Sequence, residues 1–276
     1  MAIAAPCGLL SSESLKSAHV GRMRSTKSID YQDVPRPVAA MAVEYPSGHI
    51  DGRHRHRRAQ LLYGTTGVLS VLTDEGRWVV PPQRAVWLPG GTDHEIYCRG
   101  HVSFRTLYVE PDAHPGLPAG CRVIKVSDLL RALILEAIKL PIEYELDGRD
   151  GRIMALITDE IAASTAVPLH VPMPRDRRLV RICKLLQQDP ANDSDLDAWA
   201  REAGMARRTL TRLFREETNM SFAAWRQQIR LLEALARLAV GQPITAVALD
   251  VGYNSPSAFT AMFRRIFGTT PSQYLD

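Results

Sequence analysis

The stretch GMARRTLTRLF (Gly204–Phe214) combines arginines with apolar residues at helical spacing. Leu210, Leu213 and Phe214 share one side of a helix, because residues three and four apart lie on the same face. The other side carries a polar set that consists of Arg207, Arg208, Thr211, Arg212 and Arg215. The pattern predicts an amphipathic helix with one face on a core and the other facing anions. A solvated helix, whose arginines serve only solubility, is the alternative.

The residues ahead of this helix favour a DNA-binding role. The segment LDAWAREA (196–203) also has helical periodicity, with Trp199 and Ala200 on its apolar side. Gly204 follows at the point where a tight turn needs a positive φ. Two short helices joined by a glycine turn, the second of them basic, are the layout of a helix-turn-helix DNA reader.

This unit occurs twice, because residues 199–221 resemble residues 247–271. The copies share a turn glycine, a core phenylalanine and a helix-ending residue: Gly204 and Gly252, Phe214 and Phe263, Asn219 and Gly268. Asparagine and glycine both tolerate the left-handed backbone that closes a helix. A patterned helix of about 19 residues, roughly 28 Å long, lies between the copies. It would hold two readers near the spacing of successive major grooves, which is about 34 Å.

Residues 178–276 resemble the DNA-binding domain of the AraC/XylS family of bacterial transcription regulators. The resemblance is carried by AREAGMARRTLTRLFREETNMSFAAWRQQIRLLEAL and ITAVALDVGYNSPSAFTAMFRRIFGTTPSQY. It implies that the second helix of each unit enters a major groove of promoter DNA. Position by position, the residues facing the groove are Arg207, Arg208, Thr211 and Arg212 in the first unit, and Pro256, Ser257, Thr260 and Ala261 in the second.

The side chains in these positions differ in what they can read. Arg208 and Arg212 are the leading base readers, because a guanidinium can bond guanine O6 and N7 together. The second unit offers only hydroxyls and apolar surface, so it should be the less selective reader. Phosphate contacts are assigned to Arg215, Arg226, Arg264 and Arg265. Ala206 stands where the family usually has serine, so the first reader helix should lack a side-chain cap.

Histidines form a second constellation, in GHIDGRHRHRRAQLLYGTTG (48–67) and PGGTDH (89–94). Strand alternation places His54 and His56 on one face, with Arg55 on the other. The two segments resemble the two motifs of the cupin barrel, which implies a divalent metal held by His54, His56, Gln60 and His94. Gln60 replaces the usual carboxylate and removes an anionic ligand. The alternatives are direct binding of a small effector by His54, His56, Gln60, Trp87 and His94, or simple core packing.

The fold class predicted is α+β with two domains, each burying its own core. Short apolar runs between Gly, Pro and Asp turns predict an antiparallel barrel or jelly roll, and the carboxyl end is all helical. Helices near 127–140 and 152–164 are too apolar to stand alone and suggest a subunit interface. The predicted domains are a flexible segment (1–35), the barrel (36–120), a helical dimerisation segment (121–166), a stiff proline-rich linker (167–176) and the double helix-turn-helix domain (177–276).

Charge and cysteine usage are consistent with this organisation. Residues 175–276 contain 15 Lys and Arg against 11 Asp and Glu, so they carry the entire net charge of +4. Four scattered cysteines predict neither a disulfide framework nor a zinc knuckle. The amino-terminal text lacks the features of a secretion signal, and no apolar run is long enough for a bilayer, so a cytoplasmic protein without a membrane partner is expected.

The sequence is compatible with three functions. The first is a transcription regulator that binds promoter DNA as a homodimer, responds to a small effector in the barrel and has RNA polymerase as a further partner. The second is a metal-dependent cupin enzyme with a fused helical domain. No partner acid, nucleophile or cofactor loop accompanies the histidines, so no catalytic residues are predicted and an enzyme is not expected. The third is a constitutive DNA-binding protein whose barrel serves only to dimerise.

Overall fold

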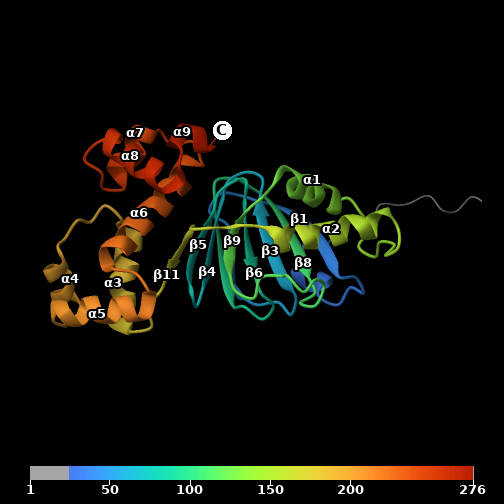
Figure 1. The fold of residues 1–276 in the computed structure, drawn as a ribbon, viewed down its shortest axis with the longest axis horizontal. Coiled ribbons are helices and arrows are strands. Elements are labelled where there is room, and N and C mark those ends of the chain that lie inside the picture. The colour runs from blue at the N-terminus through green and yellow to red at the C-terminus, as the bar shows by residue number, and fades with distance from the viewer. Residues whose placement is uncertain (1–24, 276) are drawn as a thin grey trace, which may run out of the picture.

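The computed structural model describes residues 25–275, with side chains through Tyr274. A two-sheet β domain occupies the middle of the molecule, with two helices on one side and a helical domain on the other (Figure 1). The predicted fold class is therefore confirmed: an antiparallel β domain precedes an all-helical one. Within the described part of the chain, no helix has both the length and the apolar character needed to cross a membrane.

All strand pairs in the two sheets are antiparallel. The first sheet has the order β1 (Val38–Tyr45), β8 (Val102–Val109), β3 (Ala59–Gly64), β6 (Arg84–Leu88), β9 (Arg122–Lys125) and β10 (Ala166–Val167). The second has the order β11 (His170–Pro172), β5 (Gly76–Val80), β4 (Val68–Thr73), β7 (His94–Arg99) and β2 (Ile50–His54). Side chains that alternate along these strands build two separate apolar layers.

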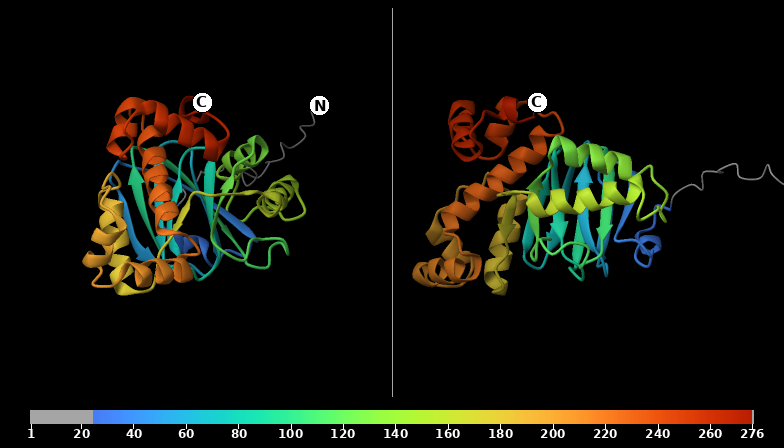
Figure 2. Two further views of the ribbon diagram at one scale, coloured as in Figure 1. Left: turned by 60° about the vertical axis from the view of Figure 1, so that its left-hand side comes forward. Right: turned by 45° about the vertical axis from the view of Figure 1, so that its right-hand side comes forward.

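The first layer lies between the sheets, where Leu62 of β3 and Leu69 of β4 are fully buried. The second lies on the outer face of the first sheet, beneath α1 (Asp128–Ala137) and α2 (Arg149–Ala163) (Figure 2). Ile134 of α1 and Ile157 of α2 are fully buried there against the sheet. The apolar stripes predicted to form a subunit interface are thus used mainly inside the chain, and Leu129 and Leu156 remain exposed.

The helical domain contains two short helix pairs connected by a long helix. Its elements are α3 (Arg177–Gln188), α4 (Leu196–Glu202), α5 (Arg207–Thr218), α6 (Phe222–Leu238), α7 (Ile244–Asp250), α8 (Pro256–Phe267) and α9 (Pro271–Leu275). The pairs α4–α5 and α7–α8 lie at opposite ends of α6 (Figure 1). Gly204 and Gly252, which form the two inter-helix turns, have φ of 61° and 85°, as predicted.

The described part of the amino-terminal segment packs against the barrel. Residues 1–24 of the predicted flexible segment (1–35) lie outside the described residues. The rest is held in place: Ser28–Tyr31 form a 3₁₀ turn (η1), and the fully buried ring of Tyr31 stacks on Tyr108 at 5.8 Å. The buried Arg58 guanidinium donates a hydrogen bond to the carbonyl of Gln32 at 3.0 Å. These residues therefore pack on the barrel through contacts that local composition does not reveal.

The proline-rich segment 167–176, predicted as a stiff and extended linker, also contributes a short strand to each sheet. The prolines do keep this segment extended, but β10 pairs with β9, and β11 pairs with β5 at the edge of the second sheet. The ring of His170 stacks on Trp78 at 3.9 Å. Buried residues of the barrel and of the helical domain form one continuous apolar cluster, so the two domains do not bury separate cores.

Candidate sensor cavity and DNA-binding surface

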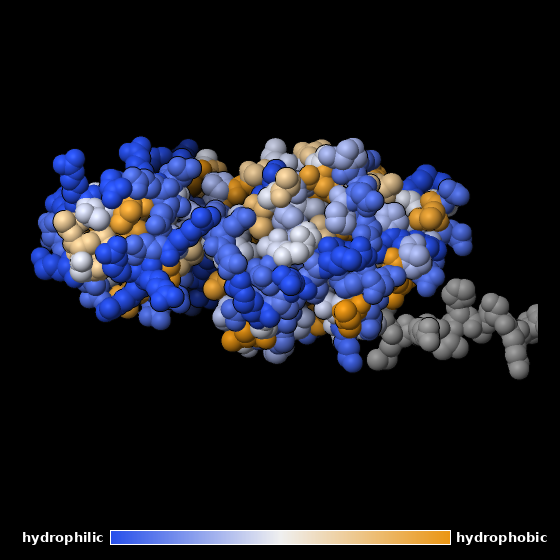
Figure 3. Space-filling view, turned by 90° about the horizontal axis from the view of Figure 1, so that it is seen from below, coloured by the Kyte–Doolittle hydropathy of each residue, from blue (hydrophilic) through white to orange (hydrophobic). Residues whose placement is uncertain are grey.

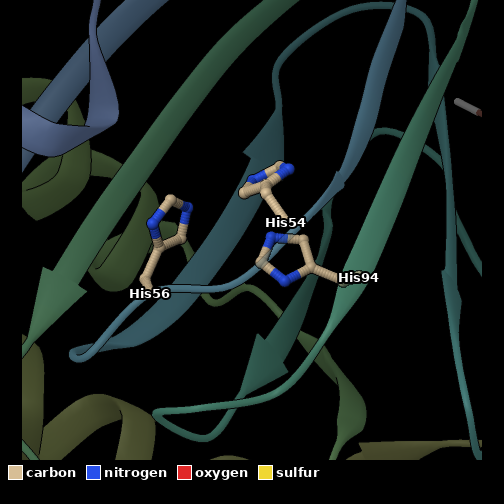
Figure 4. Close-up of side chains that lie close together, drawn as sticks. All are labelled: His54, His56 and His94. Carbon is tan, nitrogen blue, oxygen red and sulfur yellow. The ribbon is translucent and has the colours of Figure 1, made fainter.

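Three histidines converge at one end of the barrel interior (Figure 4). His54 ends β2 and lies opposite His94, the first residue of the neighbouring β7, and His56 follows two residues after His54. The ring centroids of His54 and His94 are 4.3 Å apart, and those of His54 and His56 are 4.8 Å apart. Arg55, between the two histidines, is exposed, as strand alternation predicted.

Hydrogen bonds to backbone carbonyls orient two of the imidazoles. Nδ1 of His54 lies 2.6 Å from the carbonyl of Gly52, and Nδ1 of His94 lies 2.9 Å from that of Thr92. A carbonyl only accepts, so each Nδ1 carries the proton and leaves Nε2 with a free lone pair. The Nε2 atoms of His56 and His94 are buried without a hydrogen-bond partner among the described residues. Buried ring nitrogens without a partner are the feature expected of a ligand site.

Burial favours the neutral form of the His56 and His94 rings by lowering the pKa of each. Burial, reinforced by the neighbouring His54 and His94, lowers the pKa of His56 to about 4. Burial also lowers the pKa of His94, and the hydrogen bond to Thr92 opposes this only in part. Neutral imidazole is the form that binds a metal ion or accepts a hydrogen bond from a ligand.

Gln60 contributes an oxygen to the same cavity. Its Nε2 donates to Thr106 Oγ1 at 3.1 Å, while its Oε1 is buried without a partner in the described part of the chain. The cavity has a volume of about 450 Å³ and is lined by His54, His56 and Gln60, by apolar or aromatic residues that include Met41, Ile96, Phe104 and Tyr108, and by polar residues that include Lys27, His49 and Asp51. His94 packs against His54 and His56 beside it.

The donor set fits a small divalent ion. The ligand atoms of His54, His56 and His94 lie within 4.8 Å of one another. Bonds of about 2.0–2.1 Å to zinc require nitrogen atoms about 3.3 Å apart, so small ring rotations would close the site. The carbonyls behind His54 and His94 supply the outer-shell hydrogen bonds that metal-binding histidines commonly have. The oxygen of Gln60 is the remaining candidate ligand.

Trp87 does not line this cavity, and its predicted role in effector binding is wrong. It pairs with Leu61 across β3 and β6 and belongs to the apolar layer beneath α1 and α2. Its indole Nε1 donates to the carbonyl of Pro118 at 2.8 Å. Gln60, one position before Leu61, faces the barrel interior instead. The sequence did not reveal which face of the first sheet Trp87 would occupy.

The basic face of α5 is exposed, while Leu210 and Phe214 are fully buried. Arg207 forms an ion pair with Asp197 at 3.2 Å, and Arg212 forms one with Glu216 at 2.9 Å. Arg208 makes no such contact with any residue of the described chain. As predicted, Ala206 at the start of α5 provides no side-chain cap. Seen from below, the helical domain at the left of Figure 3 is largely hydrophilic, with a small apolar patch.

The corresponding face of α8 is flatter and less charged. Its start is well defined, because Ser255 accepts a hydrogen bond from the backbone of Ala258 and proline follows at the first helical position. A shallow hollow is lined by Pro256, Ser257, Thr260, Ala261, Arg264, Arg265 and Thr270. It contains every residue that the resemblance assigned to the second reader.

Arg226 is not available for the phosphate contact predicted from the sequence. It is half-buried, and its guanidinium donates to the carbonyls of Ser194 at 3.0 Å and Asn192 at 2.6 Å. It therefore fixes the loop ahead of α4. Arg215, Arg264 and Arg265 are exposed and remain suited to phosphate.

A barrel that holds a polar cavity, joined to paired helix-turn-helix units, defines a ligand-responsive DNA-binding protein. Residues 38–203 match the family described as AraC-like ligand binding domain, and residues 199–276 match the family described as helix-turn-helix domain. The chain belongs to the AraC family of transcriptional regulators, with an amino-terminal ligand-binding domain. The predicted family and its regulatory function are confirmed.

The chain is also similar to individual proteins. The chain is 32% identical over 222 residues to the HTH-type transcriptional regulator NimR of Escherichia coli (strain K12), covering 80% of this chain and 81% of NimR. It is 36% identical over 103 residues to the HTH-type transcriptional regulator RipA of Corynebacterium glutamicum, covering 37% of this chain and 31% of RipA. The structure of ToxT from Vibrio cholerae is 10% identical with a TM-score of 0.37, covering 87% of this chain and 98% of ToxT.

Proposed function

We propose that this regulator reads promoter DNA with the exposed faces of α5 and α8 and is controlled by a small effector bound in the histidine cavity. The buried Nε2 atoms of His56 and His94, which have no partner among the described residues, are the observation that carries the proposal, because unpartnered polar atoms in a folded interior call for a ligand. This cavity also favours a sensor over a barrel that only dimerises.

We propose further that His54, His56 and His94 hold a divalent metal ion, with the oxygen of Gln60 as a fourth ligand. Bound there, the ion would supply a Lewis-acid anchor for an oxygen-donor or anionic group of the effector. The remaining lining, which is part apolar and part polar, would then select the remainder of that molecule by shape and polarity. The curated relatives are transcription regulators, which supports a sensory role for this cavity over a catalytic one.

Calorimetric titration with Zn²⁺ and with Ni²⁺ tests the metal site. We expect one equivalent to bind to the full-length protein, and His94→Ala to weaken binding at least tenfold. His101→Ala is the matched control, because His101 is an exposed histidine of the same domain and lies outside the cavity. Equal affinity in both variants would show that the ion binds elsewhere.

Binding to promoter DNA is tested by selecting fragments from a genomic pool and titrating them across a salt series. A protein that neutralises several phosphates loses affinity steeply as salt rises. A flat salt dependence, or selection of no common sequence, would contradict the assignment of α5 and α8 as readers.

A homodimer is part of the proposal, with α1 and α2 as the contact between subunits. Leu129 and Leu156 are exposed on these helices, at 48% and 38%, and they support such a contact. Sedimentation of a variant with Leu129→Glu and Leu156→Glu should give a monomer if this is the interface. Leu249→Glu, at an exposed leucine of α7, is the control that should leave the dimer intact.

RNA polymerase is the remaining proposed partner. Transcription in vitro from a selected fragment, with purified polymerase and with and without this protein, tests the interaction directly. An increase or decrease in transcript also decides whether the protein activates or represses at that site.

A further inference from the structure

The connecting helix α6 is docked along its length on the barrel. Near its start, the indole of Trp225 donates to the carbonyl of Pro172 in β11 at 2.7 Å. Beyond its end, Val240 lies so close to the β7–β8 turn that a Cβ added to Gly100 would be 3.0 Å from it. At the carboxyl end of the chain, the guanidinium of Arg84 lies over the ring of Tyr274 at 5.1 Å. The barrel therefore determines where the helical domain sits.

A chain of ion pairs crosses this junction. Arg99, the last residue of β7, donates two hydrogen bonds to Glu233 of α6, at 2.9 and 3.2 Å. Glu233 is 7% exposed and also accepts from Arg237 at 2.8 Å. Arg237 in turn donates to Asp250 of α7 at 2.7 Å. Four charged groups thus connect a barrel strand, through α6, to the first helix of the second reader. Paired, two-point contacts of this type hold orientation better than single ones.

The strand β7 has a different role on each face. Its residues alternate between buried and partly exposed, so His94, Ile96 and Cys98 face inward while Glu95, Tyr97 and Arg99 face outward. At one end of β7, His94 belongs to the histidine cluster and packs against His56, which lines the cavity. At the other end, Arg99 pairs with Glu233 of α6. The five residue steps between them span about 17 Å at the usual rise of a strand. One rigid element therefore contacts both the cavity and the helical domain.

We propose that Arg99 and Glu233 are positioning residues that couple the histidine cavity to the second DNA reader, with β7 as the connecting element. The inference rests on the proposed roles of the cavity as sensor and of α8 as reader. A ligand that shifts His94 moves β7, and the Arg99–Glu233 pair passes that movement to α6, Arg237 and Asp250. Two-state behaviour of a packed contact turns a small shift into a change of domain orientation.

Hydrogen exchange on the full-length protein tests the docking role. We expect Arg99→Ala to speed exchange of the amides in α6 and α7 about tenfold relative to those in α2, which packs on the opposite side of the barrel. Arg99→Lys should give an intermediate increase, because it keeps the charge and loses the paired contact. The matched control is Arg105→Ala, which removes an arginine that pairs with Glu44 within the barrel. Unchanged exchange in both Arg99 variants overturns the proposal.

Coupling to the cavity is tested by a double-mutant cycle between His94→Ala and Arg99→Ala. His94→Ala should alter exchange in α7 when Arg99 is present and have at most a third of that effect in the Arg99→Ala background. Additive effects overturn the coupling. The cycle requires neither metal nor DNA, so a failure of zinc or promoter binding counts against the proposed function and leaves this result intact.

Discussion

Asn219 and Gly268 close the two reader helices with the same left-handed backbone, at φ of 56° and 74°. Each donates its backbone N–H to a carbonyl one turn earlier, those of Arg215 and Arg264. The equivalence supports the internal repeat, because a shared backbone constraint persists although the side chains differ.

This constraint predicts a clear substitution pattern at Asn219. Asn219→Ala should lower the free energy of unfolding by about 1 kcal/mol, because alanine pays the full cost of a left-handed conformation. Asn219→Gly should change it little, since glycine has no Cβ. Urea denaturation of both variants measures the difference. Asn254→Ala is the control, because Asn254 is exposed and does not have a positive φ; an equal loss there would contradict the explanation.

Base selectivity should depend most on Arg208 and Arg212. Replacing either with alanine should cost about 1–3 kcal/mol of discrimination at one base pair of the selected site. Arg265→Ala should weaken binding to all DNA sequences equally, and it should reduce the slope of log affinity against log salt concentration by about one. Competition binding between the selected site and single-base variants separates the two classes. An unchanged base preference in both the Arg208 and Arg212 variants would show that α5 does not read bases.

Substitution of Arg226 should mainly lower stability, whereas substitution of Arg215 should mainly weaken DNA binding. Arg226→Met should lower the free energy of unfolding by about 1–3 kcal/mol, because the carbonyls of Ser194 and Asn192 lose their donor. Arg215→Met should leave stability within about 0.5 kcal/mol, since Arg215 is exposed, and should weaken DNA binding instead. Denaturation and binding titrations on both proteins test this. If the two variants were equally stable, Arg226 would again be a candidate for contacting phosphate.

The junction between domains should weaken in acid. Burial alone would raise the pKa of Glu233. Hydrogen bonds from Arg99 and Arg237 outweigh burial and lower the pKa below 4.5. The charge of Arg77 also faces the carboxylate. The unfolded state therefore binds the proton more readily. The stability that Glu233 contributes is present above pH 4.5 and is lost as the pH falls through the folded pKa. The stability difference between wild type and Glu233→Gln, measured from pH 7 to pH 4, should shrink toward the acid end; a constant difference contradicts this origin.

The sequence pattern predicted the structure correctly wherever residues a few positions apart determine it. Helical spacing identified α5 and its buried face, and strand alternation placed His54 and His56 inside and Arg55 outside. The glycine turns and the helix ends followed from the few residue types that accept a positive φ.

The sequence pattern did not predict structural features that depend on packing between segments far apart in the chain. The prolines of 167–176 indicated an extended backbone, but only the edge of β5 made it a strand. The charge of Arg226 suggested phosphate, whereas two carbonyls more than thirty residues away in the sequence occupy its guanidinium. Trp87 was grouped with the histidines, although the register between β3 and β6 turns it to the opposite face.

The sequence by itself determined the reader helices, their repeat and the histidines that face the barrel interior, because these depend on neighbours a few positions apart. Only the tertiary structure decided that His94 lies opposite His54 and that Arg99 reaches Glu233, 134 residues further along the chain. Such contacts depend on strand register and on the docking of α6, and both are set by the packing of the whole chain at once.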